Sequence, residues 1–108
     1  QARVKLLDEA AFYADQSGLS FARLSVRDQK SRWGSCSSEG NLNFSWRLYL
    51  MPEPILRYVV AHEISHLAHM NHGPDFWALV EKIYPDSKSA KTWMKKNAAS
   101  YHKYDATK

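Results

Sequence analysis

Apolar residues recur at helical spacing from the start of the chain. The pattern predicts an amphipathic helix over residues 2–17, and Gly18 is placed to end it just past the last turn. The apolar positions that carry this helical pattern are Val4, Leu7, Ala11 and Ala14.

Alternation of apolar and polar residues then replaces the helical spacing. It predicts a strand from Phe21 to about Asp28 and a second, shorter strand around residues 33–37. The sequence Ser-Glu-Gly-Asn at residues 38–41 has the composition of a turn. A third strand is expected over residues 42–46, with its apolar side chains on one face.

Proline and glycine divide the second half of the chain into three helices. Pro54 and Pro74 each stand where a helix can begin, because the first turn does not need their missing N–H groups. Asp86 or Ser87 can cap the last helix. The three predicted helices cover about residues 55–70, 74–84 and 87–101. The order of helix, three strands and three helices predicts an α+β fold with a small antiparallel three-stranded sheet.

Length and composition favour one compact domain over residues 1–108. Of the 108 residues, 44% are hydrophobic, which is enough for one core, and no apolar run approaches the roughly 18 residues that span a bilayer. The single cysteine, Cys36, excludes a disulfide framework and a multi-cysteine zinc knuckle. Residues 1–8 lack the features of a secretory signal. We therefore expect a cytoplasmic protein with no membrane partner.

The net charge of +4 is concentrated at the C-terminal end. From Lys82 onward, seven lysines stand against two acidic residues. The lysines of the last predicted helix could follow a phosphate backbone, which would make a nucleic acid or nucleotide partner possible. A solvated helix face explains them more simply. These lysines are Lys88, Lys91, Lys95 and Lys96.

The strongest chemical signal is the sequence His62-Glu63-Ile64-Ser65-His66. Residues four apart lie on one face of a helix, so both imidazoles can reach a metal at about 2.0–2.1 Å. Glu63 is rotated by about 100° from His62, so its carboxylate misses the metal but can reach a metal-bound water. The pattern predicts a zinc site with Glu63 as general base.

A catalytic zinc usually has three protein ligands and an open fourth position. His69 and His72 are the two candidates for the third ligand. His69 lies on the same helix face as His66 but about 4.5 Å further along the axis. His72 follows the predicted end of the helix, where Gly73 and Pro74 can turn the chain back, so His72 is favoured.

Four stretches of the chain together resemble the YgjP-like metal-dependent hydrolases, small zincins related to the SprT-like group. The resemblance runs from about Ser25 to Trp93, and the combination of WGSC, HExxH and NHxxxFW is specific. The four stretches are RWGSCS at residues 32–37, GNLN at 40–43, YVVAHEISHL at 58–67 and NHGPDFW at 71–77.

The resemblance implies a minimal zincin, in which a short antiparallel sheet packs on an active-site helix. It implies metal-dependent hydrolysis with zinc held by His62, His66 and His72 and with Glu63 as general base. The resemblance does not settle the substrate, and a peptide or protein substrate is our leading expectation for this chemistry. The spacing to His72 departs from that of metzincins. It also departs from gluzincins, whose third ligand is a later glutamate, for which Glu81 would be the only candidate.

Several alternatives stay open at this point. The same metal and water could attack a nucleotide phosphoanhydride, or a structural zinc could support a nucleic-acid-binding module. The stretch from Trp33 to Cys36 could line the cleft or belong to the core, and Cys36 itself is expected to be a buried small apolar residue. An oxyanion could be stabilised by Arg32, Asn43, His69 or a tyrosine.

Overall fold

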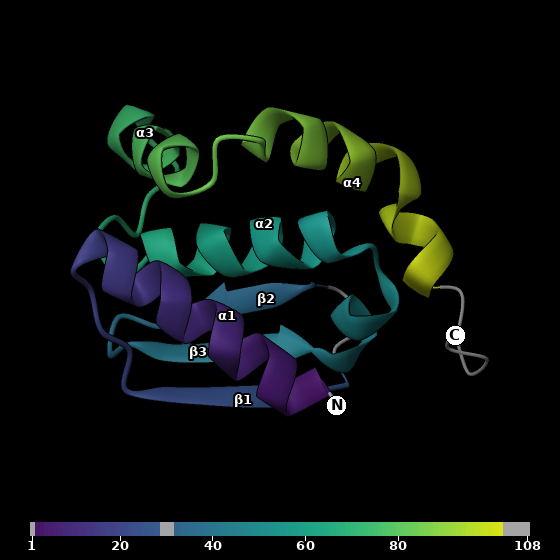
Figure 1. Cartoon of the computed structure of the whole chain (residues 1–108), viewed down its shortest axis with the longest axis horizontal. Helices are drawn as coiled ribbons and strands as arrows, with labels where there is room; N and C mark the ends of the chain where they lie inside the picture. Colours follow the sequence, from purple (N-terminus) through teal and green to yellow (C-terminus); the bar gives the residue numbers. More distant parts are fainter. Residues whose placement is uncertain (1, 29–31, 103–108) are drawn as a thin grey trace.

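The computed structural model describes residues 2–28 and 32–102 and contains the predicted helices and strands in the predicted order (Figure 1). A short 3-10 helix, η1, was not expected from the sequence. The elements are α1 (Ala2–Ser17), β1 (Arg23–Arg27), β2 (Gly34–Cys36), β3 (Asn41–Ser45), η1 (Trp46–Leu50), α2 (Glu53–Ser65), α3 (Pro74–Ile83) and α4 (Ser87–His102).

The sheet is mixed, so the prediction of an antiparallel sheet is wrong for one pair of strands. The strand order is β1-β3-β2, with β2 antiparallel and β1 parallel to β3. An antiparallel meander would place Gly34-Ser35-Cys36 in the middle of the sheet. Instead the centre is taken by β3, whose Leu42 and Phe44 are completely buried. The central strand is thus the one with the most buried side chains, since it loses contact with water at both edges.

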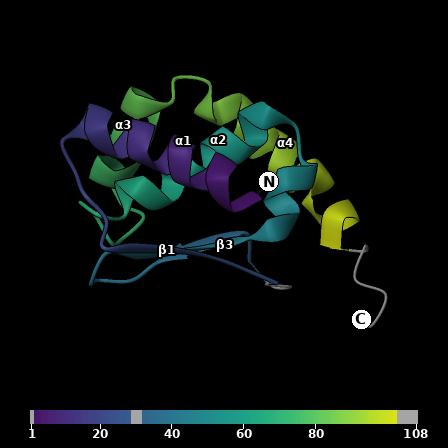
Figure 2. The same cartoon turned by 60° about the horizontal axis from the view of Figure 1, so that its bottom comes forward.

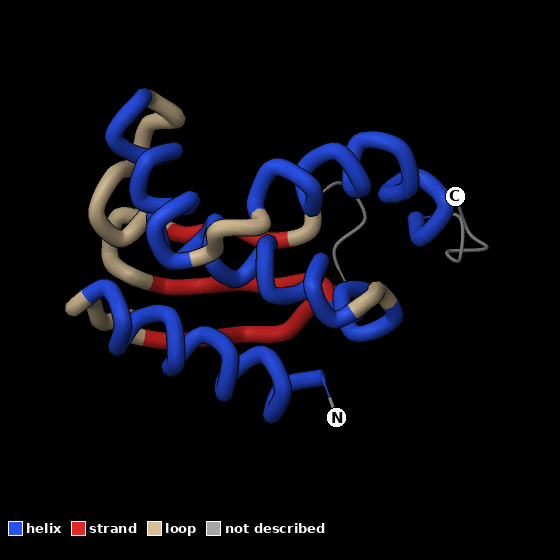
Figure 3. Tube along the Cα trace, turned by 45° about the horizontal axis from the view of Figure 1, so that its top comes forward, coloured by secondary structure: helices blue, strands red, loops and turns tan. Residues whose placement is uncertain are grey.

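The helices cover one side of the sheet (Figure 2). Helix α2 packs against α1, α3, α4 and β2, so it is the central element of the fold. The tube view shows that α1 lies beside β1 and that α4 leads to the C-terminus (Figure 3). None of the helices in the described residues is long and apolar enough to cross a membrane.

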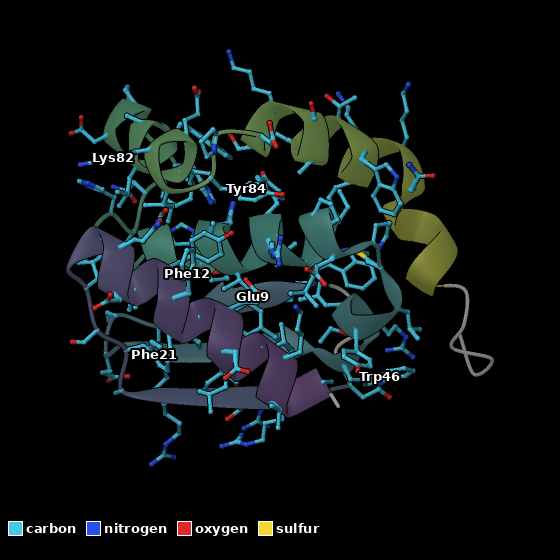
Figure 4. The ribbon with its side chains drawn as sticks, in the orientation of Figure 1. Glu9, Phe12, Phe21, Trp46, Lys82 and Tyr84 are labelled. Atoms are coloured by element: carbon cyan, nitrogen blue, oxygen red, sulfur yellow. The ribbon has the colours of Figure 1, made fainter. Side chains whose placement is uncertain are left out.

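The first helix turns a different face to the core from the one its spacing suggested. Val4 and Leu7 are 56% and 39% exposed. Of the expected positions only Ala14 is buried. The buried side chains of α1 are Leu6, Ala10, Tyr13 and Ala14, which also recur at helical spacing. Next to that face, Glu9 accepts a hydrogen bond from Arg57 of α2, whereas Phe12 is exposed (Figure 4).

Candidate metal centre

The C-terminal end of α2 positions the first two histidines. His62 lies in the last turn of the helix, and His66 is the C-cap residue with φ −66° and ψ −18°. These angles are still those of a right-handed helix, so the two side chains keep the relation of residues one turn apart. Their ring centroids are 5.1 Å apart.

The chain leaves the helix earlier than predicted, and this brings His72 to the same place. Helix α2 ends at Ser65, whereas the sequence pattern predicted it to continue to about residue 70. The turn that follows returns the chain towards the helix end. As a result, Nε2 of His72 lies 3.1 Å from Nε2 of His66.

One main-chain contact orients His66. Its Nδ1 lies 3.0 Å from the carbonyl oxygen of His69, and because a carbonyl can only accept, Nδ1 must carry the proton. In the neutral ring this leaves the lone pair on Nε2, the atom that faces His72. His69 therefore contributes its main chain, and its ring is not part of the cluster of ligand atoms.

Aromatic side chains from the first turn of α3 support the imidazoles. Phe76 is completely buried and stacks on His66 with ring centroids 4.4 Å apart. Trp77 stacks on His72 at 5.8 Å. The contact of these two aromatics with the histidines was missed in the sequence analysis. Their spacing of four and five residues after His72 is the signal that could have shown it.

Burial changes the proton affinity of the histidines. Burial lowers the pKa of His62 to about 4, and the neighbouring His66, His72 and Lys91 contribute smaller effects in the same direction. Burial also lowers the pKa of His66. Both rings are therefore neutral near pH 7, which is the form that binds a metal.

Glu63 lies in the same cleft but outside the histidine cluster. Its side chain is 5% exposed, and burial raises the pKa of its carboxyl to about 7, against a smaller lowering effect of Arg32. The close approach to β2 depends on Gly34. A Cβ atom on Gly34 would lie 3.1 Å from Cγ of Glu63.

The donor set and its spacing fit a divalent metal. The ligand nitrogens of His62, His66 and His72 all lie within 4.8 Å of one another. Two imidazole nitrogens bound to one tetrahedral zinc at about 2.0–2.1 Å would be about 3.3 Å apart, close to the separation of His66 and His72. Among the described residues, no cysteine or carboxylate joins this group. Glu81 of α3, the alternative third ligand, is exposed and lies outside it.

A cleft of about 380 Å³ opens beside the histidines and Glu63. Gly34, Ser35 and Cys36 of β2 line it together with Arg32. Cys36 is half-buried rather than fully buried as expected, and its Sγ donates to the carbonyl of Ser37. Burial, with the nearby Glu63, raises the pKa of this thiol to about 11, so the group facing the cleft is a neutral thiol.

The fold is shared with solved metallopeptidase structures. The zymogen of Pyrococcus abyssi abylysin matches with a TM-score of 0.74 and 23% identity, over 86% of this chain and 95% of that one. The metallopeptidase zymogen of Methanocaldococcus jannaschii jannalysin matches with the same TM-score and 15% identity, over 86% of this chain and 96% of that one. At these identities the likeness concerns the fold.

Comparison with curated proteins finds no match. A family model does match, and it covers residues 1–97, which include the sheet, the histidine cluster and most of α4. The model describes a metallopeptidase domain, in agreement with three imidazoles that could hold a metal beside a buried carboxyl group. The chain belongs to the YgjP-like metallopeptidase domain family.

Proposed function

We propose that the protein is a zinc-dependent peptidase in which His62, His66 and His72 hold Zn²⁺ and Glu63 is the general base. The observation that carries the proposal is the convergence of three imidazoles beside a buried carboxyl group in an open cleft. Three histidines with an open fourth position form a common ligand set of catalytic zinc. When bound there, Zn²⁺ would polarise a substrate carbonyl and make a water molecule more acidic.

Glu63 is suited to move a proton in both directions. A carboxyl group with a pKa of about 7 is partly ionised at neutral pH. It can take a proton from the attacking water and return it to the leaving amine, because its proton affinity is close to the working pH. Its position against Gly34 holds the carboxyl group at the floor of the cleft.

Two further groups support this chemistry. The hydrogen bond from Nδ1 of His66 to the carbonyl of His69 fixes the ring and makes Nε2 a better ligand. Arg32 lines the cleft with Glu63, whereas Asn43 is bonded to Arg27 and His69 faces a neighbouring cavity. Among the described residues, no tyrosine lines the cleft. Arg32 is therefore our candidate for stabilising the negative charge that develops on the carbonyl oxygen.

Glu63→Gln tests the division of roles. Because the residue is not assigned as a ligand, the variant should bind zinc with the stoichiometry of the wild type. Its rate of peptide cleavage should fall by roughly 10²–10⁴-fold, the usual contribution of a general base. Metal analysis of the purified proteins and cleavage of a peptide library measure both quantities. Loss of zinc from a folded Glu63→Gln protein would contradict the assignment of base.

His72→Ala and His69→Ala form a matched pair for the ligand set. The first removes a proposed ligand and should weaken zinc binding severely. The second removes a ring but keeps the carbonyl that orients His66, so zinc should remain bound. Competitive titration with a chelating dye measures the two affinities. Equal zinc affinity in the two variants would overturn the choice of His72.

Two additional measurements distinguish the proposed peptidase from a nucleotide hydrolase and from a nucleic-acid-binding module with a structural zinc. Hydrolysis of nucleoside triphosphates without peptide cleavage would indicate phosphoanhydride chemistry at the same site. A zinc coordination shell closed by four protein ligands would indicate a structural metal. Either result would replace the proposed peptidase function.

A further inference from the structure

A second cavity adjoins the metal centre. Its volume is about 240 Å³, and Gly34, His62 and Glu63 form part of its wall as well as part of the wall of the cleft. The remaining wall comes from α2, from α4 and from the residue that precedes β2. Here this cavity is called the Trp33–Met94 pocket, and its other lining residues are Trp33, Tyr58, Val59, Lys91 and Met94.

The outer wall of the Trp33–Met94 pocket is mainly apolar. Tyr58 and Val59 are 6% and 5% exposed, so α2 presents a rigid, packed surface. Trp33 and Met94 are half-buried and pack against the hydrophobic core. A tryptophan ring and a thioether are surfaces that aliphatic and aromatic groups contact favourably.

The two charged groups on the wall, Lys91 and Glu63, have opposite signs. The ammonium group of Lys91 lies 4.0 Å from the centre of the Trp77 ring, which it already contacts in a cation–π interaction. A charged side chain in the pocket would meet one group of like charge and one of opposite charge, so little net attraction offsets the cost of burying it. The wall therefore favours a neutral side chain.

The size of the pocket suits one side chain rather than a whole ligand. Sites that enclose complete small molecules usually have volumes of about 300–1,000 Å³. The pocket is smaller, and it shares Glu63 and His62 with the cleft in which the peptide bond would be cleaved. Because consecutive Cα atoms are only about 3.8 Å apart, its occupant belongs to a residue next to that bond.

We infer that the Trp33–Met94 pocket binds one neutral apolar side chain, aliphatic or aromatic, of a peptide residue that flanks the cleaved bond. This inference rests on the proposed peptidase function and names the substrate class. It also assigns a role to α4, which contributes Met94 and Lys91 to substrate selection.

Cleavage of a peptide library by the zinc-loaded protein tests the assignment. The wild type should cleave next to leucine, methionine or phenylalanine at least about 10-fold faster than next to aspartate or lysine, as hydrophobic pockets discriminate by factors of about 10–200. Met94→Trp narrows the pocket, because the indole is larger than the thioether side chain. It should lower cleavage next to phenylalanine by about 10-fold or more while cleavage next to alanine is retained.

Leu79→Trp is the matched control. Like Met94, Leu79 is a half-buried apolar residue on a helix. It lies on α3, and it lines neither the cleft nor the pocket. This variant should keep the wild-type preference. If Met94→Trp and Leu79→Trp both show the wild-type preference, or if the wild type cleaves next to all residues equally, the pocket assignment is overturned while the peptidase function stands.

A binding measurement on the metal-free protein separates the two proposals. N-acetyl-phenylalanine amide should shift the NMR signals of the Met94 methyl group and the Trp33 indole, whereas N-acetyl-aspartate amide should not. Met94→Trp should abolish the response of the Trp33 indole. Failure to cleave any peptide would contradict the peptidase function, and no shift with the phenylalanine amide would overturn the pocket assignment whatever the activity.

Discussion

Glu63 can approach β2 closely because Gly34 has no side chain. A Cβ atom at position 34 would lie 3.1 Å both from Cγ of Glu63 and from Cδ1 of Phe44. Phe44 is completely buried in the centre of the sheet and has no free space to move into. A side chain at this position would therefore displace the carboxyl group.

For Gly34→Ala we expect a lower kcat with little change in KM and full zinc occupancy. The added methyl group requires a shift of only a few tenths of an ångström. The loss should therefore be smaller than the factor of about 10² that a displacement of about 1 Å at a reacting group can cost. Steady-state kinetics together with metal analysis measure the three quantities. Gly73→Ala is the control, since a Cβ atom there would meet nothing within 4 Å. Equal kcat in the two variants would show that Glu63 tolerates the added methyl group.

The buried carboxyl group of Glu63 makes the stability of the metal-free protein depend on pH. Its pKa rises from an ordinary value of 4.5 to about 7 on folding, because burial disfavours the charged form. Between these values the folded chain binds more protons than the unfolded chain. The stabilising effect of the neutral group is therefore complete below pH 4.5 and is lost as the pH rises through 7, with an upper bound of about 3 kcal/mol.

Glu63→Gln removes this dependence. The Tm of the metal-free variant minus the Tm of the metal-free wild type should become larger as the pH is raised from 5 to 8. Glu39→Gln, at an exposed position, should show no such change. A difference in Tm between Glu63→Gln and the wild type that is the same at both pH values would indicate that the carboxyl group is not buried in its neutral form.

At the level of elements, α1 shows how one helix can offer two apolar stripes. Leu6 is completely buried, and the adjacent Leu7 is 39% exposed. The stripe that contains Tyr13 faces the core, whereas Val4, Leu7 and Ala11 of the expected stripe are exposed and only its last member, Ala14, is buried. Burying the larger set of side chains removes more apolar surface from water, which favours this orientation.

Leu6→Ala and Leu7→Ala test the orientation of α1 with a change of identical chemistry. Truncation of a buried leucine costs about 2–5 kcal/mol of unfolding free energy, because a cavity remains. Truncation at an exposed position should cost less than about 1 kcal/mol. Urea denaturation of both variants gives the two values. A larger loss for Leu7→Ala would favour the face that the sequence pattern suggested.

The end of α2 decides the geometry of the metal centre. Had the helix continued to residue 70, the chain could not have turned back before Asn71. Because it ends at Ser65, the turn places the carbonyl of His69 at Nδ1 of His66 and the ring of His72 at Nε2. The two nitrogens of one imidazole thus have separate partners.

At the scale of the whole molecule, the positive charge is concentrated in the lysines near the C-terminus, several of which lie on α4. Lys91 differs from the others, because its ammonium group contacts Trp77 beside the Trp33–Met94 pocket. Lys88, Lys95 and Lys96 are exposed. A solvated helix face accounts for these three, and a nucleic acid partner stays a prediction.

A triple variant in which glutamine replaces Lys88, Lys95 and Lys96 should have the peptidase rate of the wild type. It should change the unfolding free energy by less than about 1 kcal/mol, because exposed positions contribute little. Peptide cleavage and urea denaturation measure these effects. Binding of RNA or DNA by the wild type that falls steeply with salt and is lost in the variant would instead assign these lysines to phosphate contacts.

Most of the secondary structure was predicted from the sequence alone, except for η1 and the early end of α2. The helices, the strands and the spacing of His62, Glu63 and His66 follow from side-chain periodicity and from proline and glycine, because these signals act between near neighbours. The predicted choice of His72 as third ligand also used a local signal, the break at Gly73 and Pro74. That choice stays a prediction about metal binding, although the structure brings the three rings together.

Only the tertiary structure decided how distant segments meet. The parallel pairing of β1 with β3, the buried face of α1, the stacking of Phe76 on His66 and the pocket between α2 and α4 each join residues that are far apart in sequence or compete for the same buried space. Periodicity shows that a face is apolar, but it does not say what will cover it. The covering partner is selected by the total apolar area that the folded chain removes from water, which is a property of the whole molecule.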